Sequence, residues 1–470
     1  MKKIKYQIAA LVLAGGLFSA CSDDIKVGYV NEETYQTGEG TAVGYIMDSQ
    51  GKRMYTTMEL HGNATETLML KATQTPSQDV VVTAVYDESV LTDYNFENDT
   101  EFEAFPQSDM ELSDGGELTL EAGKTISSQL TVTLSSDGQR DFTKTYAIPL
   151  RLRVTSGNGT LPDEDQKRII FVKDLTALPT ATKYVDGEEG VKIFSCMEVN
   201  DANPLNNLNF TLKSNGKPLI DAVILFSSNI NYDERTGRVY LFHNENCTAI
   251  LNNYEKYLKP LKDRGIKVIL SVLGNHDRSG VANLSDETAR DFAREIKACC
   301  DAYNLDGVML DDEYSKYEYS NITPGFVYPS TSAMSRLYYE MKKIMPDRWM
   351  ITYVYGTGRS CVAVDGVQPG DYIDYALHDY GQSYDLTTSY PGLDKARWGL
   401  YSQEYTGRYF CSETNMQQLV NKGSRAHMIF AMDPNRSNVK RQIQSMQSMA
   451  KIFYKDELVI DYKFHPKDWN

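Results

Sequence analysis

The second half of the chain alternates short apolar runs with helical patterns, and this alternation constrains the fold more than any other feature. The apolar runs have the length and composition of buried strands. Eight of them occur between residues 176 and 470: Val191–Met197, Ala222–Ile230, Lys267–Leu273, Val308–Asp311, Trp349–Tyr355, Tyr372–Tyr380, Trp398–Ser402 and Ala426–Met432. Helical patterns intervene, most clearly at Cys247–Arg264, Asp286–Tyr303, Ser332–Met345 and Val439–Tyr454. This count predicts a (β/α)₈ TIM barrel over residues 176–470, with a doubly wound open sheet as the alternative.

The first half has a different texture. Between about Val27 and Val172, short segments with period-2 alternation are separated by turns such as Ser-Ser-Asp-Gly and Ser-Gly-Asn-Gly. The clearest are Glu66–Lys71, Val80–Val85, Ser128–Leu134 and Tyr146–Val154. This pattern predicts an antiparallel, all-β sandwich over residues 22–175, followed by a connector at Asp174–Glu189. The protein is therefore expected to be multidomain. No catalytic constellation occurs in the sandwich segment, for which we expect a role as a spacer or in weak glycan contact.

The amino terminus has the layout of an export signal. Basic residues at the start precede a short apolar core, Ile8–Phe18, and the small residues Ser19 and Ala20 precede Cys21. The core is too short for a spanning helix. Phe18–Cys21 resembles a bacterial lipobox, which implies a signal peptide over residues 1–21 and lipidation of Cys21. A plain signal peptide with a chance cysteine is the alternative. Ser22-Asp23-Asp24 resembles the acidic tag of Bacteroidetes lipoproteins, which implies an outer-membrane anchor and exposure at the cell surface.

Charge and cysteine spacing limit the partners. The formal net charge of −16 argues against nucleic acid, because phosphate binding requires a basic footprint. The six cysteines after Cys21 lack the C-x-x-C spacing of a zinc site, and we expect buried free thiols. We therefore expect no zinc site. We also expect no other metal, no cofactor and a monomeric protein.

The fourth predicted strand ends in three acidic residues, Asp311, Asp312 and Glu313. Because side chains alternate along a strand, Asp311 and Glu313 are expected on one side and Asp312 on the other. In a (β/α)₈ barrel, the carboxyl ends of the strands carry the chemistry. Polar residues also follow the second, third and sixth strands, at Ser227–Asn229, Asn275–Asp277 and His378–Tyr380. Paired carboxylates with amides and a tyrosine indicate proton transfer on a neutral polar substrate, and glycoside hydrolysis is the commonest such reaction.

Several motifs together resemble a known family. Asp306-Gly307, Asp311 and Glu313 resemble the D-G-x-D-x-D-x-E motif of glycoside hydrolase family 18. Phe226–Asp233, His243–Asn246, Gly265–His276 and Leu305–Tyr314 resemble, in order and spacing, the endo-β-N-acetylglucosaminidases similar to endoglycosidase H. The resemblance covers the second half of the chain. The first half resembles the β-sandwich domains of unknown function that begin many glycan-processing Bacteroidetes lipoproteins.

The resemblance implies hydrolysis of the GlcNAc-β1,4-GlcNAc core of an N-glycan or glycoprotein, by the substrate-assisted exception to the two-carboxylate retaining scheme. Glu313 is implied to be the general acid and then the base. Asp311 is implied to orient the substrate's acetamide, whose oxygen attacks the anomeric carbon, and Tyr380 to donate a hydrogen bond to that oxygen. We expect the nearby Asp311 charge to raise the pKa of Glu313.

Substrate contacts are expected from Phe226, Asn275, His276, Tyr353 and Met432. The alternatives are a role in bracing its loop for His276, and filling of the barrel for Tyr353 and Met432. His243 and His427 are expected to be packing residues.

The sequence also departs from the family pattern. Met309 stands where the family has its first motif acid, and His378 and Gly381 stand where relatives carry Asn and Tyr. Met309 motivates the alternative of a non-catalytic glycan-binding protein, against which the retained Glu313 argues. Cleavage of chitin or peptidoglycan is the alternative within the enzyme class. Which N-glycan is preferred is left open.

Overall fold

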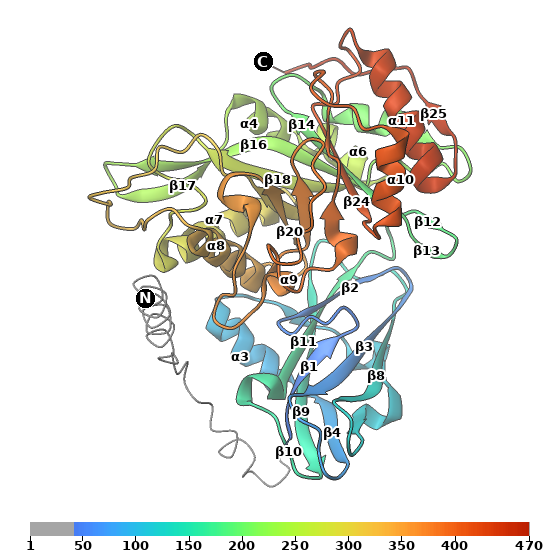
Figure 1. Ribbon diagram of the computed structural model, residues 1–470, viewed down its shortest axis with the longest axis vertical. Coiled ribbons are helices and arrows are strands. Elements are labelled where there is room, and N and C mark those ends of the chain that lie inside the picture. The colour runs from blue at the N-terminus through green and yellow to red at the C-terminus, as the bar shows by residue number, and fades with distance from the viewer. Residues whose placement is uncertain (1–41, 470) are drawn as a thin grey trace, which may run out of the picture.

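The computed structural model describes residues 42–469, which form two domains placed end to end. In Figure 1 a β-rich domain, blue to green, lies below a larger α/β domain, green to red. The predicted architecture of a β-sandwich followed by a TIM barrel is confirmed. The predicted export signal and Cys21 lie outside the described residues.

The N-terminal domain consists of two sheets that pack face to face. One has the strand order β10-β1-β3-β8-β6 and the other β2-β11-β9-β4-β7, with β5 paired to β9. The strands are β1 (Ala42–Asp48), β2 (Thr56–Leu60), β3 (Asn63–Ala72), β4 (Val80–Tyr86), β5 (Glu103–Ala104), β6 (Met110–Leu112), β7 (Glu117–Leu120), β8 (Ile126–Ser135), β9 (Tyr146–Ser156), β10 (Gly159–Thr160) and β11 (Lys167–Asp174). Most pairs are antiparallel, as predicted, but β1–β10, β2–β11 and β5–β9 are parallel.

A helix that the sequence did not predict covers the outer face of the second sheet. Helix α3 (Glu88–Asn98) begins at Asp87, whose side chain accepts the N–H of Ser89, and buries Val90, Leu91 and Tyr94 against a cluster that includes Phe171. Its sequence has almost no amphipathic pattern, so helical periodicity did not reveal it.

The C-terminal domain is a closed barrel of eight parallel strands. The strands follow in the order β14 (Lys192–Glu198), β16 (Ala222–Asp233), β18 (Lys267–Gly274), β19 (Gly307–Leu310), β20 (Trp349–Val354), β21 (Tyr375–His378), β22 (Trp398–Gly399) and β24 (Ala426–Phe430), and pairing of β14 with β24 closes the ring. The helices are α4 (Glu245–Asn252), α5 (Tyr254–Tyr257), α6 (Lys259–Lys262), α7 (Asp286–Ala302), α8 (Thr331–Ile344), α9 (Pro369–Tyr372), α10 (Glu413–Asn421) and α11 (Val439–Tyr454). Each predicted strand is present.

Short additional strands occur in the connector and around the barrel. Strand β17 (Arg238–Phe242) returns antiparallel along β16, and the resulting hairpin projects at the left of Figure 1. Strand β23 (Gln403–Glu404) pairs with β24. Two further pairs are β12 (Tyr184–Val185) with β13 (Glu188–Glu189), inside the predicted connector, and β15 (Phe210–Leu212) with β25 (Leu458–Ile460). Among residues 42–469, no helix combines the length and apolar character that crossing a bilayer requires.

Two predicted elements differ from the structure at proline residues. The expected helix Cys247–Arg264 is divided into α4, α5 and α6, and α6 has a proline in its first turn. The expected strand Tyr372–Tyr380 begins only at Tyr375, because Pro369–Tyr372 form the short helix α9.

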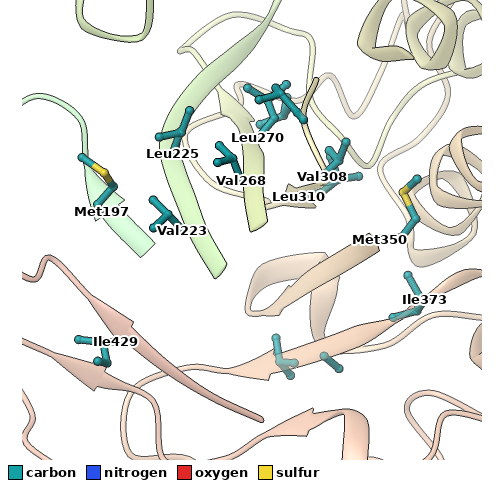
Figure 2. Close-up of a cluster of buried hydrophobic side chains, with 14 of the residues drawn as sticks. Met197, Val223, Leu225, Val268, Leu270, Val308, Leu310, Met350, Ile373 and Ile429 are labelled. Carbon is teal, nitrogen blue, oxygen red and sulfur yellow. The ribbon is translucent and has the colours of Figure 1, made fainter. Parts of the chain in front are cut away.

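Alternation along the barrel strands separates two apolar layers. Figure 2 shows outward-facing side chains between the strands and the surrounding helices, among them Val223, Leu225, Val268, Leu270, Val308 and Leu310. The intervening residues fill the barrel interior, among them Ile224, Ile269, Met309 and Ile351. Met309 therefore lies on the inner side of β19, in the same alternating set as Asp311 and Glu313, as predicted.

Three buried carboxylates join neighbouring strands at the amino-terminal end of the barrel. The aspartates stand one residue before β16, β19 and β21, the second, fourth and sixth strands of the ring. Each accepts a backbone N–H from the preceding strand and pairs with a lysine. Asp221 accepts from Ile193 and pairs with Lys183, Asp306 accepts from Val268 and pairs with Lys262, and Asp374 accepts from Met350 and pairs with Lys342. The N···O distances of the ion pairs are 2.6, 2.7 and 2.8 Å. These contacts give Asp306 a structural role at the entrance of β19.

The sandwich domain docks on this same end of the barrel. Lys52 Nζ lies 3.2 Å from Asp374, and the backbone N–H groups of Arg53 and Met54 donate to Asp371. The buried Arg168 guanidinium holds the loop that carries these residues, by donating to the carbonyl oxygens of Lys52 and Arg53. The interface therefore includes specific ion pairs and hydrogen bonds, and it leaves the carboxyl ends of the barrel strands uncovered.

We expect Asp374→Ala to lower the free energy of unfolding by about 3–5 kcal/mol, because the substitution leaves the buried Lys342 without its carboxylate. The N–H of Met350 loses its acceptor as well. Urea unfolding monitored by tryptophan fluorescence measures the loss.

The matched control is Asp263→Ala, which removes a carboxylate that also pairs with a lysine, Lys259, at 2.6 Å but on the exposed surface. Exposed pairs contribute little, so this variant should unfold close to the wild type. Equal losses in the two variants would contradict a structural role for Asp374.

Candidate active site

A cavity of ≈ 480 Å³ opens at the carboxyl ends of the barrel strands. It is lined by Cys196, Glu198, Phe226, Met309, Asp311, Glu313, Tyr314, Tyr353, Tyr355, Asp379, Tyr380, Glu404, Thr406, Arg408, Met428 and Phe430. This size falls within the range of small-molecule sites. Five carboxyl groups and a single cation line it, so the cavity favours groups that bear or develop positive charge.

Asp311 lies deep in the cavity and is 2% exposed. Its Oδ1 atom is buried and has no hydrogen-bond partner in the protein. Burial raises the pKa of Asp311 well above its usual value, and the charges of Glu313, Asp312 and Asp379 raise it further. A buried polar atom without a partner is costly, so this oxygen is available to a donor that enters the cavity.

Glu313 is half-buried, and its main chain is held against the end of β18. The N–H of Gly274 donates to the Glu313 carbonyl oxygen at 3.1 Å, and a Cβ atom at Gly274 would lie 2.4 Å from that oxygen. Burial raises the pKa of Glu313, the Asp379 charge adds to the rise, and Arg408 opposes it. The expected rise in pKa is thus present, but burial and Asp379 cause it in place of Asp311.

Asp379 joins two tyrosines of the cavity. Its Oδ1 atom accepts the hydroxyl of Tyr353 at 2.5 Å and the backbone N–H of Tyr380 at 2.6 Å. Burial raises the pKa of both tyrosines, which keeps their hydroxyls protonated as donors. Asp379 therefore fixes the position of Tyr380 and places a negative charge near Glu313.

Aromatic rings form the walls between the acids. The rings of Phe226 and Phe430 meet edge to face with their centroids 5.3 Å apart, and the ring centroid of Tyr380 lies 5.9 Å from that of Phe430. On the other side Tyr353 stacks on Tyr355 at 5.8 Å. Large amphipathic rings around a polar floor suit a ligand with both apolar C–H faces and hydroxyl groups.

Arg408 reaches the cavity on a tight turn after β23. The buried Glu404 carboxylate holds this turn by accepting the N–H groups of Thr406 at 3.0 Å and Arg408 at 2.8 Å. Glu198, at the end of β14, also lines the cavity, and burial raises its pKa to about 7.

The structure brings five of the eight predicted catalytic and substrate-binding residues into this one cavity: Asp311, Glu313, Tyr353, Tyr380 and Phe226. Asn275 and His276 do not line it. Asn275 donates to Asn231, and His276 is exposed on the neighbouring loop. Asp312 points elsewhere, as expected, and accepts from Tyr317 and from the N–H of Thr357.

Met432 is turned away from the cavity, although the period of β24 predicts the opposite. Met428 and Phe430 face the cavity, so Met432 would follow at the next inward position. The left-handed conformation of Ala431, with φ of 55°, ends the alternation at that point. Met432 is 1% exposed and packs in the outer apolar layer, where it lies out of reach of a ligand in the cavity.

Sequence reasoning placed Asp379 among the polar residues that follow the sixth strand but gave it no role, and it missed Glu198, Glu404 and Arg408. Glu198 is the last residue of β14, so its position at a strand end was a usable signal. Glu404 and Arg408 depend on the conformation of a turn that no sequence pattern indicated. His243 and His427 contact Ser228 and Gln403 respectively, away from the cavity lining.

The arrangement suits proton transfer. Across residues 42–469 there is no group of three His, Cys, Asp or Glu side chains that could hold a metal ion. A half-buried carboxyl group with a raised pKa, a deeper carboxyl group and a tyrosine hydroxyl are the parts that general acid–base catalysis on a neutral substrate requires.

Comparisons with known proteins agree with this chemistry. The chain is 55% identical over 285 residues to endo-β-N-acetylglucosaminidase F1 of Elizabethkingia meningoseptica, a match that covers 59% of this chain and 83% of that protein. It is 34% identical over 223 residues to an endo-β-N-acetylglucosaminidase of Flavobacterium sp. (strain SK1022), covering 47% and 68%. A family described as a "-like, N-terminal domain" matches residues 35–159.

A solved structure matches both domains together. The crystal structure of EndoBT-3987 from Bacteroides thetaiotamicron with a Man5GlcNAc product superposes with a TM-score of 0.82 at 34% identity, covering 90% of this chain and 98% of that one. The same protein with Man9GlcNAc2Asn gives a TM-score of 0.76 at 31% identity, with the same coverage. By its fold, the chemistry of its cavity and its identity to two named enzymes over most of their length, the chain belongs to the endo-β-N-acetylglucosaminidase family of glycoside hydrolases.

Proposed function

We propose that the enzyme hydrolyses the GlcNAc-β1,4-GlcNAc bond in the core of N-linked glycans, with a preference for oligomannose chains. The observation that carries the proposal is the pair Asp311 and Glu313 at the barrel mouth, with Asp311 Oδ1 unpartnered. The oligomannose preference is supported by EndoBT-3987, which was solved with Man5GlcNAc and with Man9GlcNAc2Asn.

The reaction begins with a proton on the carboxyl pair. Glu313 donates this proton to the bridging oxygen, while the acetamide oxygen of the substrate attacks the anomeric carbon and the bond to the leaving sugar breaks. Water then attacks the oxazolinium-like intermediate, and Glu313 accepts the proton of that water. The Tyr380 hydroxyl donates to the acetamide oxygen, and the two pyranose faces contact the aromatic walls.

Substrate binding places the proton on the correct acid. In the empty cavity burial favours a proton on Asp311, whose pKa is raised most. An acetamide N–H donated to Asp311 Oδ1 stabilises the ionised form of Asp311, because a hydrogen bond to a carboxylate lowers its pKa. The proton shared by the pair then resides on Glu313, next to the bridging oxygen. Met309 supplies no acid beneath Asp311, so in this enzyme the incoming acetamide is the donor that ionises Asp311.

We expect Glu313→Gln to lower kcat by about 10²–10⁴-fold with binding retained, because it removes the proton donor and keeps the shape of the side chain. Mass spectrometry of an oligomannose glycoprotein measures loss of the glycan, and calorimetry with the released glycan measures binding. Glu318→Gln, in the same loop and outside the cavity, is the control and should retain activity.

The same assay separates the alternatives. If the wild-type protein removes no oligomannose, hybrid or complex glycan but releases sugars from chitin oligomers, it is a chitin-cleaving enzyme and the proposal is wrong. Binding of the glycan with no cleavage of any of these substrates would leave a glycan-binding protein.

The pH profile should respond in opposite directions to two substitutions. Glu313 acts in its protonated form, so kcat/KM falls as pH rises through its pKa. Asp379 raises that pKa and Arg408 lowers it. Asp379→Asn should therefore move the alkaline limb to lower pH, and Arg408→Gln should move it to higher pH. Shifts in the same direction would show that at least one of the two charges does not act on Glu313 as proposed.

We also propose that the enzyme is a monomeric lipoprotein, held by an acyl group on Cys21 at the outer face of the outer membrane. The basic start, the short apolar core and the Ser19-Ala20-Cys21 sequence support the lipid anchor. A diacyl anchor suffices for stable membrane attachment.

Cys21→Ser should abolish incorporation of labelled palmitate and release the enzyme from the membrane fraction of the producing cells. Fractionation and immunoblotting measure this, and the activity of the released protein is the control for folding. Equal membrane recovery for the variant and the wild type would contradict the anchor.

A further inference from the structure

Tyr314 and His276 form a pair at the rim of the cavity, outside the machinery described above. Tyr314 directly follows the acid Glu313, lines the cavity and remains 57% exposed. Its ring meets the His276 ring edge to face at 5.4 Å. A large ring that is both exposed and at a cavity edge is free to contact a ligand.

The backbone holds this exposed ring in one position. The N–H of His276 donates to the Tyr314 carbonyl oxygen at 2.9 Å. The N–H of Gly274 donates to the carbonyl oxygen of Glu313, the residue before Tyr314. Gly274 permits the close approach, since a Cβ atom there would lie 2.3 Å from the Ser315 hydroxyl. The main chain that carries the ring is therefore held by the same set of contacts as the main chain of the acid.

Both residues have left-handed backbone conformations, with φ of 62° at Tyr314 and 60° at His276. This region is unfavourable for a bulky side chain, and such residues concentrate where function requires the geometry. Neither ring is covered by the core, so apolar burial does not offset the strain.

We infer that Tyr314 is the platform for the leaving-group sugar, the GlcNAc that remains on the asparagine, and that His276 is a positioning residue for its ring. This inference rests on the proposed function. Glu313 must meet the bridging oxygen between the two GlcNAc units. Asp311, deeper in the cavity, takes the acetamide of the unit being attacked. The second unit then lies on the outer side of Glu313, where Tyr314 presents its ring to the apolar face of the pyranose.

The same position on Tyr314 should also bind the acceptor sugar when the reaction runs in reverse. When the 4-hydroxyl of an incoming GlcNAc replaces water, it forms the new glycosidic bond at the anomeric carbon. The oxazoline ring opens to the acetamide, and the hydroxyl proton passes to Glu313. The acceptor must occupy the same position as the leaving group, by microscopic reversibility.

The test compares two reactions of the full-length enzyme with an oligomannose oxazoline. Hydrolysis of the oxazoline uses only water, whereas transfer to GlcNAc-asparagine requires the platform. We expect Tyr314→Ala to raise the KM for the acceptor about tenfold, the scale of one aromatic contact, and to change the rate of hydrolysis much less. Tyr314→Phe should behave as the wild type, because stacking needs the ring and not the hydroxyl.

His276→Ala should raise the acceptor KM in the same direction by a smaller factor, and Tyr319→Ala is the matched control. Tyr319 is 65% exposed in the same loop but does not line the cavity, so its loss should leave acceptor KM unchanged. Equal losses of hydrolysis and transfer in Tyr314→Ala would place the ring against the other sugar and overturn the inference, as would an unchanged acceptor KM. A wild-type enzyme that consumes neither oxazoline nor glycoprotein would instead refute the proposed function.

Discussion

The amino-terminal end of the barrel is held together by carboxylates that are buried with a cation beside them. Asp221, Asp306 and Asp374 each tie the start of one strand to its neighbour, and each has a lysine beside it. For Asp306 and Asp374 burial opposes ionisation, but the neighbouring lysines outweigh it and lower the pKa. Asp306 and Asp374 therefore remain charged at neutral pH, which keeps their lysine pairs and strand contacts intact.

The opposite end of the same barrel uses the same residue type without a cation. Asp311 is as deeply buried as Asp374, but its neighbours are other acids, so its pKa moves in the opposite direction. One end of the barrel thus carries carboxylates that stabilise the fold, and the other end carries carboxyl groups able to exchange protons. The sandwich domain adds Lys52 to the first set and contributes nothing to the lining of the cavity.

Much of the fold was predictable because the strands of a parallel barrel are continuous apolar runs, and all eight were recognised. Helix α3 was not, because it lacks an amphipathic stripe. In the candidate site, strand alternation placed Asp311 and Glu313 on one side of β19. Met432, an expected substrate contact, packs in the outer layer because Ala431 leaves the extended conformation. Arg408 and the hydrogen bonds of Asp379 depend on how loops turn in space, which local pattern does not determine.

The docking of the sandwich has a consequence for the size of substrate that the enzyme accepts. Its ion pairs and hydrogen bonds with the barrel include those at Lys267, Asp347, Asp371 and Asp374, which lie before a barrel strand or at its first residue. The cavity lies at the other end, so the two domains do not compete for space around it. Within residues 42–469, a folded glycoprotein therefore approaches the mouth from open solvent, and the loops of the barrel set the steric clearance.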